Sequence, residues 1–147
     1  NVAGLQAYLN GPSGQNAWKN SVTMADIFAN TTITSFDNLN QGKRDAFQQL
    51  IIEMSKLSLL DATKASCRKG FADIFAVTGS YTDSAQLDKM MTGACVEVAT
   101  RAEVMFGFST PAATGTTTAI KRTLKFTLDE TDIKSLIFRD NGSNWSA

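Results

Sequence analysis

The chain has 147 residues, of which 43% are hydrophobic, so it is long enough to bury a core of its own. Lys and Arg number 14 together, as do Asp and Glu, and a net charge of zero gives no long-range attraction to nucleic acid or anionic lipid. The sequence has no histidine, the commonest general base and metal ligand, and no apolar run long enough to cross a membrane. These features predict a protein that is not an enzyme, needs no cofactor and has no membrane partner.

Residues 1–15 are expected to form an N-terminal arm, because the cluster Asn10-Gly11-Pro12-Ser13-Gly14 separates them from the rest of the chain. A first helix is predicted near residues 16–29, with an inward face of Trp18, Val22, Ala25, Phe28 and Ala29. The second helix has the clearest pattern. Asn40 is its expected N-cap, and its apolar stripe is Phe47, Leu50, Ile51, Met54 and Leu57.

A third helix is expected from Asp61 to about Val77, and a fourth from Thr82 or Asp83 to about Ser109, before Pro111. Residues 110–118 are small and polar and indicate a loop, with a fifth helix beginning within residues 116–118. Residues 123–128 fit either a helix or a strand. Thr127-x-x-Glu130 resembles a capping box and predicts a last short helix ending at Asn141-Gly142. The expected fold is therefore all-α, a single five- or six-helix bundle over residues 16–139 followed by a tail at 140–147.

Cys67 and Cys95 fall on the inward stripes of the third and fourth helices. If the chain reverses near Tyr81, these two cysteines lie level with each other, which predicts one inter-helix disulfide. Structural disulfides persist mainly in secreted proteins, so the pairing predicts an extracellular location. The alternative is a pair of free, buried thiols that pack as small apolar side chains.

Charged side chains are spread over several predicted helices. Lys64 and Arg68 are spaced i, i+4 and share one helix face, as phosphate binding would require, but aromatic residues for base stacking are not interleaved with them. Nucleic acid is therefore an unlikely partner, although a viral coat subunit needs only backbone contacts. Three N-x-Ser/Thr sequons, at Asn30, Asn141 and Asn144, are possible glycosylation sites.

The stretch from Trp18 to about Phe126 resembles the N-terminal domain of spider silk proteins, the spidroins. The likeness is in layout: Trp18 opens the first helix, and Ala25-Asp26-x-Phe28, Leu50-x-x-x-Met54-x-Lys56, Gly70-Phe71-Ala72-Asp73-Ile74 and Phe106 to Ala113 follow. Members of that family are secreted helical bundles that form antiparallel homodimers when the pH falls. The resemblance implies a dimer interface formed by Trp18, Asp45, Lys64, Arg68 and Asp73. In it Asp45 and Lys64 or Arg68 would supply attractive charges, Asp73 would accept a proton, and Trp18 would report the conformational change. The other two acids of the family's pH relay have no clear counterpart.

The expected function is that of a secreted, non-enzymatic structural domain that forms homo-oligomers. One alternative is a carrier of a hydrophobic small molecule, because nine phenylalanines and five methionines could line a cavity. Others are a helical filament or viral coat subunit, and an enzyme that would use a buried carboxylate or an activated Cys67 or Cys95 thiolate.

Overall fold

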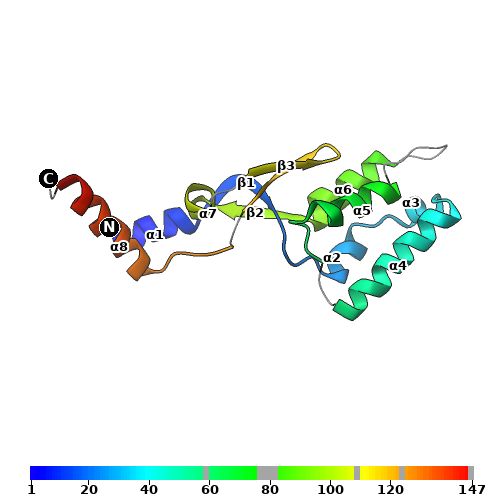
Figure 1. The fold of residues 1–147 in the computed structure, drawn as a ribbon, viewed down its shortest axis with the longest axis horizontal. Coiled ribbons are helices and arrows are strands. Elements are labelled where there is room, and N and C mark those ends of the chain that lie inside the picture. Colours follow the sequence, from blue (N-terminus) through cyan, green and yellow to red (C-terminus); the bar gives the residue numbers. More distant parts are fainter. Residues whose placement is uncertain (58–59, 76–82, 108–109, 123–124, 146–147) are drawn as a thin grey trace. The chain divides into compact units, whose positions relative to one another are not determined.

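The computed structural model describes residues 1–57, 60–75, 83–107, 110–122 and 125–145, except for some side chains, including those of residues 138–145. It contains both helices and strands, and most of the helices lie between the first and the second strand (Figure 1). In chain order they are α1 (Val2–Asn10), β1 (Pro12–Trp18), α2 (Met24–Ala29), α3 (Ile33–Asp37), α4 (Gln41–Leu57), α5 (Ala65–Phe75), α6 (Ser84–Ala94), β2 (Val96–Thr100), α7 (Arg101–Phe106), β3 (Thr110–Thr114), β4 (Thr117–Lys121) and α8 (Glu130–Trp145).

The prediction of an all-α bundle is wrong, because the chain contains a four-stranded sheet with the strand order β2-β1-β4-β3. Strand β1 runs parallel to β4, with Ala17 opposite Ile120. β3 and β4 are joined by Gly115 and Thr116, and Gly115 has a φ of +59°, which a glycine adopts without strain. The run of threonines that was expected to form a loop and a helix start therefore forms a hairpin, as β-branched residues favour.

Several predicted helices are replaced or shortened by these strands. The expected helix at 16–29 is divided between β1 and α2, and α2 begins at a capping box in which Thr23 and Asp26 bond to each other's backbone. The expected long fourth helix does begin at an N-cap Asp83, but α6 ends at Ala94, and β2 and α7 follow. The second predicted helix is confirmed as α4, where the Asn40 side chain accepts a hydrogen bond from the Lys43 backbone.

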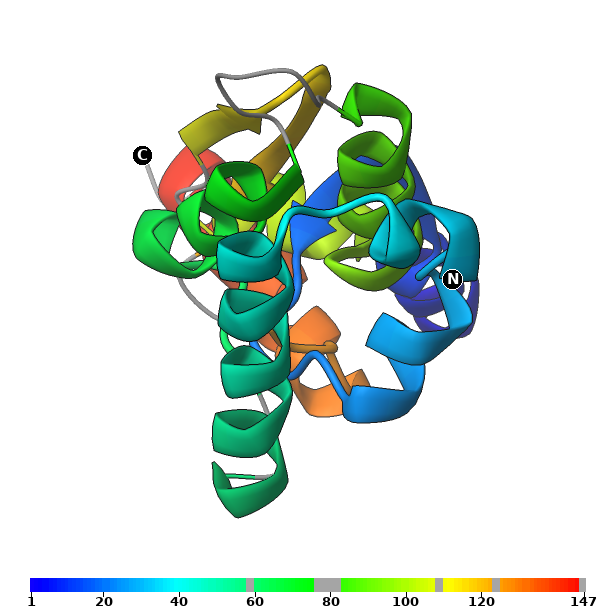
Figure 2. The ribbon, with the colours of Figure 1, turned by 90° about the vertical axis from the view of Figure 1, so that its right-hand side faces the viewer.

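The chain divides into two units, each with its own apolar core. Unit 1 comprises residues 1–15, 98–110 and 122–147, and unit 2 comprises residues 16–97 and 111–121. Unit 2 contains α2 to α6, and Figure 2 views it from the end where α3 joins α4. Its core includes Trp18, Phe71, Phe75, Met90 and Met91, none of which is exposed. The core of unit 1 is much smaller and is formed by Leu9, Ala102 and Ile133.

The predicted disulfide is also wrong, because Cys67 and Cys95 are both free thiols. Cys95 is buried in the core of unit 2 and Cys67 is partly buried against it, so the alternative of two free thiols that pack as small apolar side chains is correct except that Cys67 is not fully buried. Cys95 is not on the helix but at its C-cap, where α6 has ended and the backbone carbonyl of Cys95 accepts a hydrogen bond from Lys19. The argument for an extracellular location depended mainly on this disulfide and loses its main support.

The burial of Cys95 predicts a loss of stability at alkaline pH. Burial raises the pKa of Cys95 to about 12, against an ordinary thiol value of 9.0. Above pH 9 the unfolded chain releases this proton while the folded chain keeps it, so the free energy of unfolding falls as the pH rises. We expect a fall of about 1.4 kcal/mol per pH unit between pH 9 and the folded pKa. Urea unfolding at pH 8 and pH 10.5 measures it, and a Cys95→Ala variant, which lacks this thiol, should show a smaller fall than the wild type. Equal falls in the two proteins would contradict the assignment.

Candidate functional site

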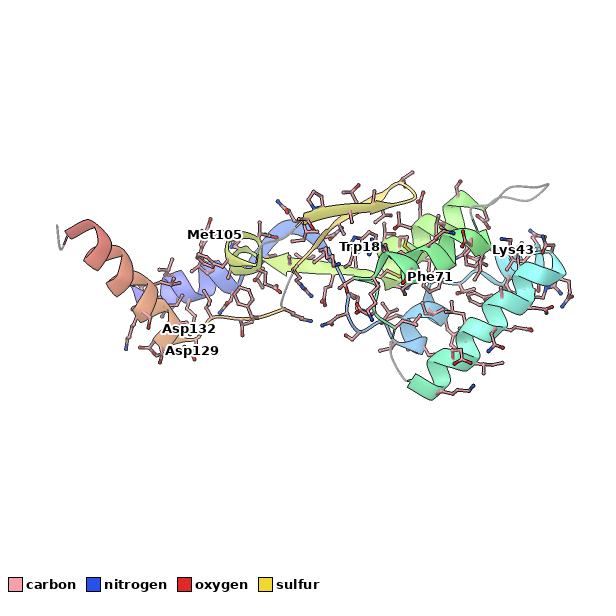
Figure 3. All side chains as sticks on the ribbon, viewed as in Figure 1. Trp18, Lys43, Phe71, Met105, Asp129 and Asp132 are labelled. Atoms are coloured by element: carbon pink, nitrogen blue, oxygen red, sulfur yellow. The ribbon has the colours of Figure 1, made fainter. Side chains whose placement is uncertain are left out.

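The residues predicted to form a dimer interface do not form one surface. Trp18 is completely buried, Arg68 is 4% exposed, and both belong to the interior of unit 2. Lys64 and Asp45 are exposed, and Asp45 accepts a hydrogen bond from Gln41 on its own helix. Asp73 forms an ion pair with Lys69 at 2.6 Å, and its backbone carbonyl accepts from Lys43. Figure 3 labels Trp18 and Lys43, which both belong to unit 2.

Trp18 and Arg68 are brought together as a structural pair. The Arg68 guanidinium lies 4.5 Å from the centre of the Trp18 ring, a cation–π distance. Its Nε donates to Thr114 Oγ1 at 2.9 Å, and its Nη1 donates to the Ala62 carbonyl at 2.6 Å. Burial lowers the pKa of Arg68. These contacts hold Arg68 inside, so Lys64 and Arg68 do not form the basic helix face that phosphate binding would use.

Of the three sequon asparagines, the structure describes the side chain of Asn30 alone. Asn30 is half-buried, and its side-chain amide donates to the Asp26 carbonyl at 2.8 Å. The side chains of Asn141 and Asn144 lie outside the described part of the chain, although the backbone there belongs to α8.

A better candidate site is an apolar groove in unit 2, framed by α2, α3 and α4. It has a volume of about 550 Å³. All of its lining residues are uncharged, and six of the eight are Phe or Ile: Phe28, Thr31, Ile33, Phe36, Phe47, Gln48, Ile51 and Ile52. Such a lining can desolvate an apolar partner without having to bury a charge.

The floor of the groove is fixed by aromatic packing. Phe47 on α4 is only 4% exposed, and its ring lies 5.7 Å from those of Phe36 and Phe75. The Arg44 guanidinium lies 5.7 Å from the centre of the Phe36 ring and donates to the carbonyls of Asp37 and Leu39. Arg44 therefore ties the end of α3 to α4 and sets the shape of the groove before anything binds to it.

The rim of the groove is unusually exposed for apolar side chains. Phe28 is 54%, Ile33 77% and Ile52 48% exposed. Among the described residues of unit 2, these three are the only large hydrophobic side chains that are exposed, and all three line this groove. A group of exposed apolar residues on one surface is typical of a binding surface, whereas isolated ones are common everywhere.

In the described parts of the chain, no group of three His, Cys, Asp or Glu residues could hold a metal ion. Nor does any helix in those parts combine the length and the apolar character needed to cross a membrane.

Comparison with models of known protein families, with curated protein sequences and with solved structures gave no match. The resemblance to spidroin N-terminal domains therefore stays a prediction, but the all-α fold that it implied is not the fold of this chain.

Most of the groove was not predicted from the sequence. Phe28 was expected on the inward face of a helix, but Ile27 is the buried residue of α2 and Phe28 faces outward. Ile52 lies next to Ile51, outside the apolar stripe of α4, and Ile33 lies among three threonines after the first predicted helix. The signal in the sequence was that Ile33 and Ile52, although large and apolar, have no place on the inward stripe of a predicted helix.

Proposed function

We propose that this chain is a non-enzymatic structural subunit that associates with copies of itself, and that the groove framed by α2, α3 and α4 is where the copies join. The observation that carries the proposal is the gathering of Phe28, Ile33 and Ile52 around one uncharged groove. Removing such side chains from water is favourable by about 25 cal/mol for each Å² of apolar surface, and this gain opposes the entropy that two chains lose when they associate.

A carrier of a hydrophobic small molecule is the second candidate, because a volume of about 550 Å³ falls within the range of ligand pockets. Ligand pockets of that kind enclose most of the ligand's surface. Here the rim residues are themselves about half or more exposed, so the groove is open to water along its edge. An open groove with exposed apolar rims favours a protein partner, which covers the rim as well as the floor.

The experiment is the change Ile33→Asp, measured by sedimentation velocity over a range of protein concentrations. Ile33 is the first residue of α3, where an acidic side chain suits the helix N-terminus, so the fold should tolerate the change. The new carboxylate would be desolvated by a partner in the groove. We expect a loss of affinity of about 2 kcal/mol or more, which is roughly 30-fold in the dissociation constant.

The matched control is Ala46→Glu. Ala46 is exposed on α4, the same helix that supplies Phe47 and Ile51, but it does not line the groove. The Ala46→Glu variant should associate like the wild type. If Ile33→Asp and Ala46→Glu associate equally well, the groove is not the interface.

A further inference from the structure

Unit 1 presents an apolar helix face that matches the groove in character. On α1, Leu5 is 36% and Tyr8 57% exposed, and the two residues are neighbours on one face at i, i+3 spacing. Ala3, Gly4 and Ala7 are exposed beside them and are small enough to let the helix backbone approach a partner closely. We call Ala3, Gly4, Leu5, Ala7 and Tyr8 the outer face of α1.

The charge pattern singles out α1 from the other helices. Of the helices that the structure describes, α1 alone contains no Asp, Glu, Lys or Arg. The groove is lined only by uncharged residues, so a charged helix entering it would leave ions desolvated and without partners. The outer face of α1 brings no charged side chain of its own, and the Arg101 guanidinium, which lies 4.2 Å from the centre of the Tyr8 ring, must remain outside the contact.

The opposite side of α1 is fixed to unit 1, which leaves the outer face available. Gln6 Nε2 and Asn10 Nδ2 donate to the Leu128 carbonyl at 3.2 and 2.7 Å, and the Leu128 backbone N–H donates to Asn10 Oδ1 at 2.8 Å. Leu9 is buried in the core of the same unit. Because α1 is already held as a helix, binding through its outer face requires little ordering of the chain.

We infer that the groove of one copy binds the outer face of α1 of a second copy, an inference that rests on the proposed function. The two surfaces differ and belong to different units, so the contact is head-to-tail rather than symmetric. Contacts of this kind continue from copy to copy and either close into a ring or extend as a filament. α1 has nine residues and is only about 13 Å long, so the contact lies at the small end of protein interfaces and should be reversible.

Two variants, each lacking one of the two surfaces, test this arrangement. The groove variant is Ile33→Asp. The helix variant is Leu5→Glu, with Tyr8→Glu as a second version because Tyr8 is more exposed and a glutamate there would lie near Arg101. Met105→Glu is the matched control, since Met105 is 63% exposed in unit 1 but lies on α7 (Figure 3).

Sedimentation velocity is run on each variant alone and on an equimolar mixture of groove and helix variants. Alone, each should remain a monomer, with affinity weakened about 30-fold or more, while Met105→Glu associates like the wild type. The mixture should form a one-to-one dimer that grows no further, because each dimer uses the one intact groove and the one intact helix. Formation of this dimer also shows that both variants are folded.

The other outcomes separate the two proposals. If the helix variants associate like the wild type while Ile33→Asp does not, the groove joins the copies but α1 is not its occupant. A mixture that stays monomeric, with both proteins folded by circular dichroism, would overturn the head-to-tail contact in favour of a symmetric one. If all variants keep the same mass as the wild type at every concentration, the proposed function itself fails.

Discussion

Replacing Glu103 by alanine should destabilise unit 1 by about 3–5 kcal/mol, because it removes one partner of a buried ion pair. Glu103 is 2% exposed, and its Oε2 lies 3.2 Å from Nη1 of Arg122, which is 4% exposed. Glu103 Oε1 also accepts from the Thr100 backbone at 2.9 Å, and Oε2 accepts from the Phe126 backbone at 3.3 Å. One carboxylate thus caps α7, holds the chain that leads to α8 and neutralises a buried guanidinium.

Amide hydrogen exchange measures this effect one helix at a time. In Glu103→Ala the amides of α1, α7 and α8 should exchange faster by a factor of about 100 or more, while those of α4 and α5 in unit 2 change little. The matched control is Glu130→Gln, which breaks the exposed Glu130–Lys134 pair on α8 and should cost less than about 0.5 kcal/mol. Equal exchange rates in the two variants would show that the buried ion pair stabilises unit 1 no more than the exposed pair does.

The second large effect is expected from Trp18→Ala, at about 3–5 kcal/mol. Trp18 is completely buried, its Nε1 donates to the Ala112 carbonyl at 3.2 Å, and its ring lies against Arg68. Removing the ring leaves a cavity and takes away the aromatic face over which the guanidinium lies. Urea unfolding followed by circular dichroism gives the change in the free energy of unfolding.

Trp18→Phe is the informative companion variant. It keeps an aromatic face for Arg68 but loses the hydrogen bond to Ala112, so a cost of about 1–2 kcal/mol is expected. Because Trp18 is buried and the groove is elsewhere, Trp18→Phe should associate like the wild type. A change in oligomeric state without a change in stability would instead support a role for Trp18 in the interface, as the spidroin resemblance implied.

The sequence predicted those elements whose pattern is local and strong. The helical stripe of Phe47, Leu50 and Ile51 predicts α4, and Asp83 correctly marks the start of α6. A capping box does begin the last helix, but it pairs Asp129 with Asp132, labelled in Figure 3, rather than Thr127 with Glu130. These signals depend on residues within a few positions of one another.

The sheet could not be predicted in the same way, because its strands gain their partners from distant parts of the chain. Val96, Val98 and Thr100 alternate as in a strand, yet Val98 also continues the helical stripe of Leu87, Met91 and Cys95, and only pairing in the sheet decides between the two. Trp18 was correctly expected to be buried, but it reaches the core from β1 and not from a helix. For Trp18, burial was predicted correctly although the element that achieves it was not.

The groove could not be predicted for a related reason. A single stripe identifies the face that a helix buries, but Phe28, Ile33 and Ile52 come from three different helices, and only the fold brings them together. In the sequence, Phe28 fits the inward face of a predicted helix while Ile33 and Ile52 lie outside the apolar stripes, so no local pattern links the three residues.

Native mass spectrometry of the wild-type protein at neutral pH, over a range of concentrations, tests the central claim most directly. Self-association through the groove predicts species at multiples of the 15.9 kDa chain mass, with no bound small molecule and an abundance that rises with concentration. A monomer at every concentration that carries an apolar molecule would contradict the claim and identify the chain as a carrier.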